Sequence, residues 1–343
     1  MDLTRRRLLS ATAGAAGAGL LAGCIDGAAG GDDESGSGGP VARSTFFVFG
    51  DITSQVAGDA ADAELLVPLG QHGHGWEPGP NVREDIHGAD LLVHGMPEFQ
   101  PWVDGITADL EADGSDVATV DMSSRVDLLG PNDHPDDHDG EEHDEEGHDD
   151  ESEHDDHADD DHDDHNDADP HFWMDPLRVQ DAVETVQAGL ADVDPDSVDA
   201  YRANADDFTA RLDDLHEDIE STVDEASTDT ILVAGHDSFR YLGDRYDVDV
   251  AALTNVSPDD RPSTRDIERA QSIIDDQDLR YVCADPLESQ QAAQQLVAET
   301  DAEAVLPLTA MPGLTDEWER EGWGYVEVME QVNLPTMERA LGV

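Results

Sequence analysis

Short apolar runs alternate with amphipathic stretches along most of the chain. In the first half, apolar runs that predict strands lie at 45–49, 64–67 and 90–93, with helical patterns at 50–59, 82–88 and 101–112. In the second half, the corresponding strands are expected at 230–234, 279–284 and 304–306, with helices at 263–277 and 289–300. Strands that alternate with helices are typical of a parallel sheet covered by helices. The pattern therefore predicts an α/β fold of two similar lobes, each a parallel β-sheet flanked by helices.

The clearest helical pattern lies between the two lobes. Apolar residues recur there at spacings of three and four, at Val198, Tyr201, Ala205, Phe208, Leu212, Leu215, Ile219 and Val223. This spacing places them on one face of a helix. Because Asp194 is a suitable N-cap and Pro195 fits the first turn, we predict a helix over 195–226. At 1.5 Å per residue it is about 45 Å long, and it would be one long, rigid link between the lobes.

The N-terminus carries the features of an exported lipoprotein. Arg5 and Arg6 supply the twin arginines of a Tat-type signal, and a run of small and apolar residues follows. The run is too short for a membrane-spanning helix. It ends in Leu-Ala-Gly before Cys24, which resembles a lipobox whose cysteine is lipidated. We therefore expect export by the Tat route and anchoring through Cys24 on the extracellular face of the cell membrane.

These features and the strand pattern divide the chain. We expect a lipoprotein signal over 1–24, a flexible tether over 25–43, an N-terminal lobe over 44–175, a helical linker over 176–228 and a C-terminal lobe over 229–343.

An acidic, histidine-rich tract at 133–169 interrupts the N-terminal lobe. It holds twenty-two Asp or Glu residues and eight histidines: His134, His138, His143, His148, His154, His157, His162 and His165. Such a composition cannot bury a core, so we expect a disordered, solvated loop. Since imidazoles and carboxylates both bind divalent metals such as Zn²⁺, the tract is expected to bind metal weakly and reversibly.

Negative charge extends well beyond this tract. The chain has a net charge of −66, and outside the tract 61 acidic residues face only 17 basic ones. So few basic residues argue against nucleic acid as a partner. The acidity indicates a halophilic, haloarchaeal source, where molar salt screens the repulsion between surface charges.

Three histidines stand outside the tract in ordered-looking motifs. His74 lies in Gly-His-Gly-Trp-Glu-Pro, His171 in Asp-Pro-His-Phe-Trp-Met-Asp-Pro, and His236 in Gly-His-Asp-Ser-Phe. His74 and His236 each follow a predicted strand, and ligands of open α/β sheets collect at the carboxyl ends of strands. Three neutral imidazoles would form a tetrahedral Zn²⁺ site with a fourth position open to water or another oxygen.

The three motifs resemble those of a known family. The chain is similar to the zinc-uptake (ZnuA-like) branch of the cluster A-I solute-binding lipoproteins of ABC metal transporters, over roughly residues 44–310. The resemblance rests on 74–78, on 169–176 and on His-Asp-x-Phe-x-Tyr-Leu at 236–242, with the acidic tract directly before the second motif. It implies a two-lobed fold joined by one long helix, with zinc held in the cleft and delivered to an ABC permease. We expect the protein to be a monomer.

Other residues near these motifs remain candidates for the site. His72 could compete with His74 as a ligand, and Asp285 stands where the family often has Glu. Asp175 and Asp237 are interpreted as partners that orient imidazoles. The absence of an acid from Ala304 to Leu314, and His at 236 in place of Glu, favour Zn²⁺ over Mn²⁺, which prefers more oxygen ligands.

Three alternatives remain open at this point. The first is a manganese- or iron-specific binding protein of the same family. The second is a zinc hydrolase, although no His-Glu-x-x-His or similar motif supplies a general base. The third is a surface metal buffer or adhesin that uses the tract alone. We favour metal delivery and do not expect an enzyme.

Overall fold

A computed structural model describes residues 39–68, 76, 78–130, 168–257 and 261–343. The predictions for the lipoprotein signal, for most of the tether, for His72 and His74, and for the eight tract histidines fall on residues outside these ranges. The predicted ends of the tether and of the disordered tract are wrong: 41–43 belong to the first strand, and Asp169 is buried and hydrogen-bonded.

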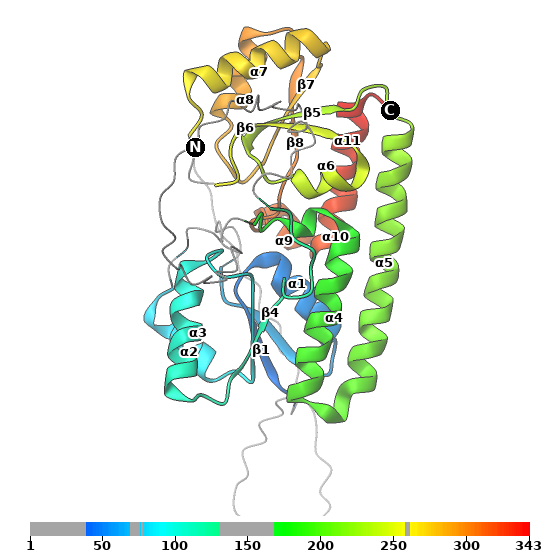
Figure 1. Cartoon of the computed structure of the whole chain (residues 1–343). Helices are drawn as coiled ribbons and strands as arrows, with labels where there is room; N and C mark the ends of the chain where they lie inside the picture. Colours follow the sequence, from blue (N-terminus) through cyan, green and yellow to red (C-terminus); the bar gives the residue numbers. More distant parts are fainter. Residues whose placement is uncertain (1–38, 69–75, 77, 131–167, 258–260) are drawn as a thin grey trace, which may run out of the picture. The chain divides into compact units, whose positions relative to one another are not determined.

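The first lobe is built on a parallel sheet of four strands (Figure 1). The strands are β1 (Val41–Ser44), β2 (Asp62–Leu65), β3 (Leu91–His94) and β4 (Ala118–Asp121), in the spatial order β2-β1-β3-β4. The helices of this lobe are α1 (Phe47–Ala57), α2 (Pro80–His87) and α3 (Pro101–Asp113). Each helix follows a strand in the chain, as parallel pairing requires.

The second lobe repeats this arrangement. Its parallel strands are β5 (Thr230–His236), β6 (Asp249–Thr254), β7 (Tyr281–Ala284) and β8 (Ala304–Pro307), in the order β6-β5-β7-β8. Its helices are α6 (Arg240–Tyr246), α7 (Thr264–Gln277) and α8 (Gln291–Glu299). In both lobes the second strand lies outside the first, and the third and fourth lie on its other side. The prediction of an α/β fold with two similar lobes is confirmed.

Two helices connect the sheets. α4 (Pro176–Val193) packs against α5 (Val198–Asp224), which extends along both lobes in Figure 1. The predicted apolar face of α5 is buried at Tyr201, Ala205, Phe208, Leu212, Leu215 and Ile219. α5 contacts α1 in the first lobe and α11 (Leu334–Leu341) in the second, so the predicted long linking helix is confirmed. No helix in the described ranges combines the length and the apolar character needed to cross a membrane.

The C-terminal segment forms a second connection between the lobes. It comprises α9 (Asp316–Glu321), α10 (Tyr325–Val328), a π-helical turn (Met329–Asn333) and α11. The backbone N–H of Tyr325 donates to Asp51 Oδ2 of α1 at 2.8 Å. Glu327 pairs with Arg211 of α5 at 2.6 Å. α11 contacts β5 and β7, so this segment joins the second sheet to the first lobe.

One predicted strand is wrong. The apolar run at 45–49 begins helix α1, and the first strand is instead Val41–Ser44. Phe46, Val48 and Phe49 are all buried, because the beginning of α1 is enclosed by the core on several sides. A short, continuously apolar run cannot distinguish a buried strand from a buried helix, so the pattern alone was insufficient here.

A buried carboxylate joins α4 to the second lobe. Asp175 is fully buried and is the N-cap of α4, where its side chain accepts from the backbone N–H of Leu177. Arg178, one turn along α4, donates to Asp175 Oδ2 at 3.1 Å. Arg245 of α6 donates to the same oxygen from Nε at 2.8 Å and approaches it with Nη2 at 2.7 Å. One carboxylate thus holds two guanidinium groups from different elements.

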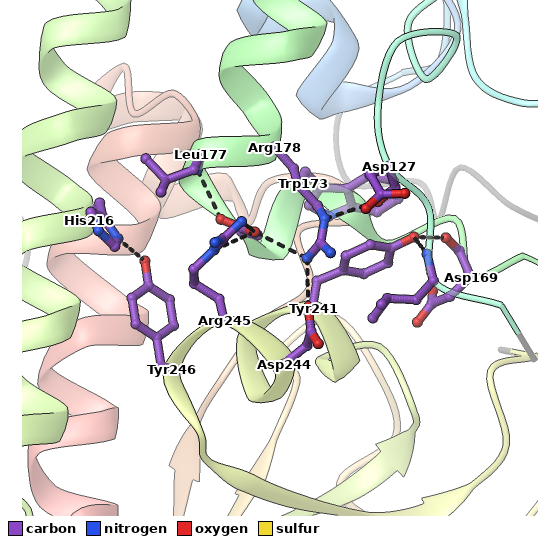
Figure 2. Close-up of polar contacts among 12 residues, drawn as sticks. Asp127, Asp169, Trp173, Leu177, Arg178, His216, Tyr241, Asp244, Arg245 and Tyr246 are labelled. Atoms are coloured by element: carbon purple, nitrogen blue, oxygen red, sulfur yellow. Dashed lines mark hydrogen bonds and ion pairs between the residues drawn. The ribbon is translucent and has the colours of Figure 1, made fainter. Parts of the chain in front are cut away.

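Arg178 extends this network further (Figure 2). Its Nε donates to the carbonyl of Asp127 at 3.0 Å, and its Nη1 also donates to Asp244 of α6 at 3.0 Å. The guanidinium lies over the ring of Tyr241, 4.8 Å from the ring centroid. We call Asp175, Arg178, Tyr241, Asp244 and Arg245 the α4–α6 network.

We predict that Asp175→Asn destabilises the protein strongly. Asn keeps the helix cap but removes the charge that faces two guanidinium groups. Because Arg245 is about one-third exposed, the loss in the free energy of unfolding should be roughly 2–3 kcal/mol, below the usual cost of breaking a fully buried pair. Denaturant unfolding measures it. Asp199→Asn is the control, since Asp199 pairs with Arg202 at the surface. Equal stability of the two variants would contradict the importance of this network.

Candidate metal-binding site

Two histidines predicted from separate motifs lie side by side in the structure. His171 precedes a short 3₁₀ helix (Phe172–Met174), and His236 is the last residue of β5. Their ring centroids are 5.3 Å apart, with 47° between the ring planes. The exposed fractions are 1% for His171 and 7% for His236, so both imidazoles are shielded from bulk water.

The orientation of His171 is fixed by Asp169. Asp169 Oδ1 lies 2.8 Å from His171 Nδ1 and also accepts from the backbone N–H of His171 at 2.9 Å. A carboxylate on Nδ1 favours the tautomer with the proton on that nitrogen, which leaves the lone pair on Nε2. The segment therefore presents His171 Nε2 as a potential metal ligand.

Asp169 is itself held from both sides. Its backbone N–H donates to the carbonyl of Leu129 at 2.9 Å, and its carbonyl accepts from the Tyr241 hydroxyl at 2.6 Å. The same hydroxyl accepts from the backbone N–H of Leu129 at 2.9 Å. Arg240 donates to the carbonyl of Gly130 at 2.8 Å. Residues on the two sides of 131–167 are thus tied to each other and to α6.

Trp173 anchors the His171 segment to both lobes. Its ring packs against Phe46, Phe49 and Phe99 of the first lobe, with centroid distances of 5.1–5.8 Å. Its indole N–H donates to the carbonyl of Ala310, after β8 of the second lobe, at 2.8 Å. The ring also meets His171 edge-on at 5.3 Å. Such packing leaves the histidine little freedom to rotate.

His236 has an acidic neighbour from a different loop. Glu288 lies between β7 and α8, and its Oε1 is 3.3 Å from His236 Nδ1. This arrangement matches that of Asp169 and His171, with a carboxylate beside Nδ1 in each case. Sequence analysis missed Glu288, which lies outside the three motifs. Its place just beyond the carboxyl end of β7 was the only available signal.

Asp285 begins the loop that carries Glu288. It is 8% exposed, and Oδ2 accepts from the Thr309 hydroxyl at 2.7 Å and from the backbone N–H of Ala310 at 3.2 Å. Oδ1 accepts from the backbone N–H of Leu287 at 2.8 Å. Burial raises the pKa of Asp285 to about 6, and the nearby charge of Glu288 adds to the increase. These contacts fix Asp285 at the base of the turn that carries Glu288.

The remaining predicted residues are placed differently. Asp175 lies in the α4–α6 network, where its hydrogen bonds go to Arg178, Arg245 and a backbone N–H. Those contacts account for its burial, and its predicted role of orienting an imidazole gains no support from them. Asp237 is buried beside His236, and its backbone N–H donates to the carbonyl of Asn255 at 3.1 Å. Its role stays a prediction.

The described residues supply only part of a metal site. His171 and His236 are two suitable nitrogen donors, but within the described ranges no group of three or more His, Cys, Asp or Glu could hold a metal ion. His74 and His72 lie outside these ranges. Trp76, from the same sequence motif as His74, packs edge-on against Trp102 at the beginning of α3, with ring centroids 5.2 Å apart.

Comparisons with known proteins agree with this fold and chemistry. Residues 43–340 match the family described as zinc-uptake complex component A, periplasmic (ZnuA). A high-affinity zinc uptake system protein, ZnuA of Bacillus subtilis, is 26% identical over 298 residues, covering 87% of this chain and 86% of its own length. The zinc-binding lipoprotein AdcA of Streptococcus pneumoniae is 28% identical over 298 residues, covering 86% of this chain. The chain spans about half of AdcA, 54% of its length.

A solved structure supports the same conclusion. Zn(II)-bound AdcA from Streptococcus pneumoniae superposes with a TM-score of 0.69 at 25% identity, covering 89% of this chain and 58% of that one. With the family match, the fold defines a solute-binding protein of metal uptake, and not an enzyme. The chain belongs to the ZnuA family of zinc-uptake components.

We predict that Asp285→Asn changes how stability depends on pH in the zinc-free protein. The pKa of Asp285 is about 6 in the folded state, against an ordinary value of 3.8. The folded state therefore holds this proton more tightly than the unfolded chain, and the carboxyl destabilises the fold increasingly as pH rises through this range. From about pH 4.5 to 7.5 the variant should gain about 2 kcal/mol relative to the parent.

The measurement is denaturant unfolding of both proteins in a chelator at the two pH values. Asn does not titrate, so the change with pH isolates the ionisation from any lost hydrogen bond. A stability difference that stays constant with pH would show that the carboxyl ionises normally.

Proposed function

We propose that this chain captures Zn²⁺ outside the cytoplasmic membrane through His74, His171 and His236 and delivers it to an ABC permease. The observation that carries the proposal is the pair of buried imidazoles of His171 and His236, contributed by separate segments and each with a carboxylate beside Nδ1. Neutral imidazoles are the usual nitrogen ligands of zinc, and acidic neighbours raise their basicity.

His74 would complete a three-histidine site, with His72 as the alternative from the same motif. The fourth position would take water or a carboxylate. Few oxygen ligands suit Zn²⁺ better than Mn²⁺, and the stretch from Ala304 to Leu314 supplies no acid. Asp237 and Asp285 would line the site.

The N-terminal features suit a protein held at the cell surface. Residues 1–24 would direct export by the Tat route, lipidated Cys24 would anchor the chain, and the residues from 25 up to β1 would tether a monomeric binding unit. The overall acidity suits a halophilic, haloarchaeal source. The lobes would occupy the residues from β1 to 175 and 229–343, with 176–228 as the helical linker.

The acidic tract would collect metal near the site. Leu129 and Asp169, on the two sides of 131–167, are hydrogen-bonded to each other, and Asp169 is also bonded to His171. Both ends of the segment that carries the tract histidines would therefore lie close to a cleft ligand, and metal held weakly on them would be released near it. A short tether of this kind raises the effective concentration of what it carries.

We predict that the full chain binds one zinc ion tightly. Competition with a chelator strong enough to keep the tract histidines metal-free measures this site alone. His171→Ala, His236→Ala and His74→Ala should each lose affinity by more than the roughly 10–100-fold that removal of an outer partner costs. Excess Mn²⁺ should not displace the zinc.

His216→Ala is the matched control. His216 lies on α5, with Nδ1 3.0 Å from the Tyr246 hydroxyl, so its loss should leave zinc affinity unchanged. Preferential binding of manganese would transfer the protein to a manganese-specific function. Tight zinc binding that survives His236→Ala would contradict the proposed site.

We predict that replacing 131–167 with a short Gly-Ser link slows zinc uptake when zinc is scarce but leaves cleft affinity unchanged. The contacts among Leu129, Asp169 and Tyr241 join the cut ends, so the fold should tolerate the deletion. Uptake by cells that carry the variant is the measurement, with zinc affinity of the purified protein beside it.

A variant with the eight tract histidines changed to Asn keeps the tract's length and acidity. It should be as slow as the deletion if imidazoles collect the metal. Uptake at the parent rate in the deletion would remove the collecting role altogether.

A further inference from the structure

Glu288 lies against the chain just where it presents His236. Its Oε1 is 3.3 Å from His236 Nδ1, and a Cβ added at Gly235 would lie 3.4 Å from Oε2. The carboxylate therefore extends along residues 235 and 236, with one oxygen at the imidazole and the other near the preceding glycine. The Glu288 side chain is 24% exposed, so water only partly surrounds it.

The loop that carries Glu288 is fixed by its own hydrogen bonds. The backbone N–H of Glu288 donates to the carbonyl of Asp285 at 3.0 Å, and that of Leu287 donates to the Asp285 carboxylate at 2.8 Å. The Gln290 amide nitrogen donates to the carbonyls of Asp285 at 2.6 Å and of Glu288 at 3.2 Å. Asp285 is in turn bonded to Thr309. Glu288 thus projects from a pre-ordered turn.

The contact joins the same two groups as the contact of Asp169 with His171, at 3.3 Å instead of 2.8 Å. A carboxylate beside Nδ1 draws the imidazole proton to that nitrogen and leaves the lone pair on Nε2. Such partners also fix the ring orientation and increase the basicity of the ligand nitrogen. Asp169, before α4, and Glu288, after β7, thereby orient His171 and His236.

We infer that Glu288 is a positioning residue for His236: it selects the Nδ1–H tautomer and so prepares Nε2 to bind zinc. This inference rests on the proposed function, in which His236 is a zinc ligand. Glu288 acts through His236 and does not itself bind the metal.

The experiment compares the full chain with Glu288→Ala, Glu288→Gln and the control Glu321→Ala, which changes an exposed glutamate at the end of α9. Long-range ¹H–¹⁵N spectra of zinc-free, ¹⁵N-histidine-labelled protein at a fixed pH near 8 report the tautomer of each imidazole, and His236→Ala assigns the signal. Chelator competition at the same pH gives the zinc affinity, and thermal unfolding gives the stability of the zinc-free protein.

Glu288→Ala should move His236 away from the Nδ1–H tautomer and weaken zinc binding roughly 10–100-fold, with little change in melting temperature. Glu288→Gln should retain much of both properties, because its amide oxygen still accepts from Nδ1–H. If Glu288→Ala does not fold, Glu288→Gln still tests whether the carboxylate affects the tautomer and the zinc affinity. Glu321→Ala should match the parent.

Two results would overturn the inference and leave the proposed function intact. Parent-like affinity and tautomer in Glu288→Ala would show that the contact has no positioning role. An unchanged tautomer, with equal loss of zinc in the Gln and Ala variants, would make Glu288 a direct ligand instead. If the parent chain bound no zinc, the proposed function would fail, and the inference that rests on it would fail as well.

Discussion

The geometry of the site depends on one buried carboxylate, Asp175. A fully buried charge is costly unless ionic and hydrogen-bonding partners compensate it, and here Arg178, Arg245 and the first turn of α4 do so together. Because Arg245 belongs to α6, which follows His236 in the chain, this network ties the start of α4 to the lobe that carries His236. His171 lies four residues before Asp175. The network therefore helps to set the separation of the two imidazoles, together with Trp173, which joins the His171 segment to both lobes.

Acidic groups around the imidazoles make the site suited to a cation. Asp169 lies beside His171 and Glu288 beside His236, while Asp285 is buried at the start of the turn that carries Glu288. Burial is the main cause of the raised pKa of Asp285, and the nearby negative charge of Glu288 adds to the increase. A dication offsets such crowding, since its own charge is the largest local electrostatic contribution where it binds. The same acidic groups that orient neutral donors thus also favour a positively charged solute.

Whether an element could be predicted from the sequence depended on how many of its faces are buried. α5 was predictable because only one of its faces is buried, which leaves a regular spacing in the sequence. The beginning of α1 could not be predicted. Because it is buried on several sides, its apolar residues are consecutive and do not show the spacing that distinguishes a helix from a strand. His171 and His236 stood in motifs, whereas Glu288 acquires its importance only when the turn after β7 places it beside Nδ1. Asp175 was predicted to orient an imidazole, but its side chain is bonded to two arginines, and Arg245 comes from α6, whose packing no sequence period specifies.

The connections between the lobes bear on how a bound ion could leave. α5 contacts α1 of the first lobe and α11 of the second, and Tyr325 of the C-terminal segment is hydrogen-bonded to Asp51 of α1. The α4–α6 network adds a third link. A wide hinge opening would have to break all three, including the buried pairs of Asp175. Glu288 lies outside these three links, in the turn between β7 and α8, whose hydrogen bonds join Asp285, Leu287 and Gln290 to one another. We therefore expect release to proceed through local rearrangement of the turn that carries Glu288, with the two sheets remaining in place.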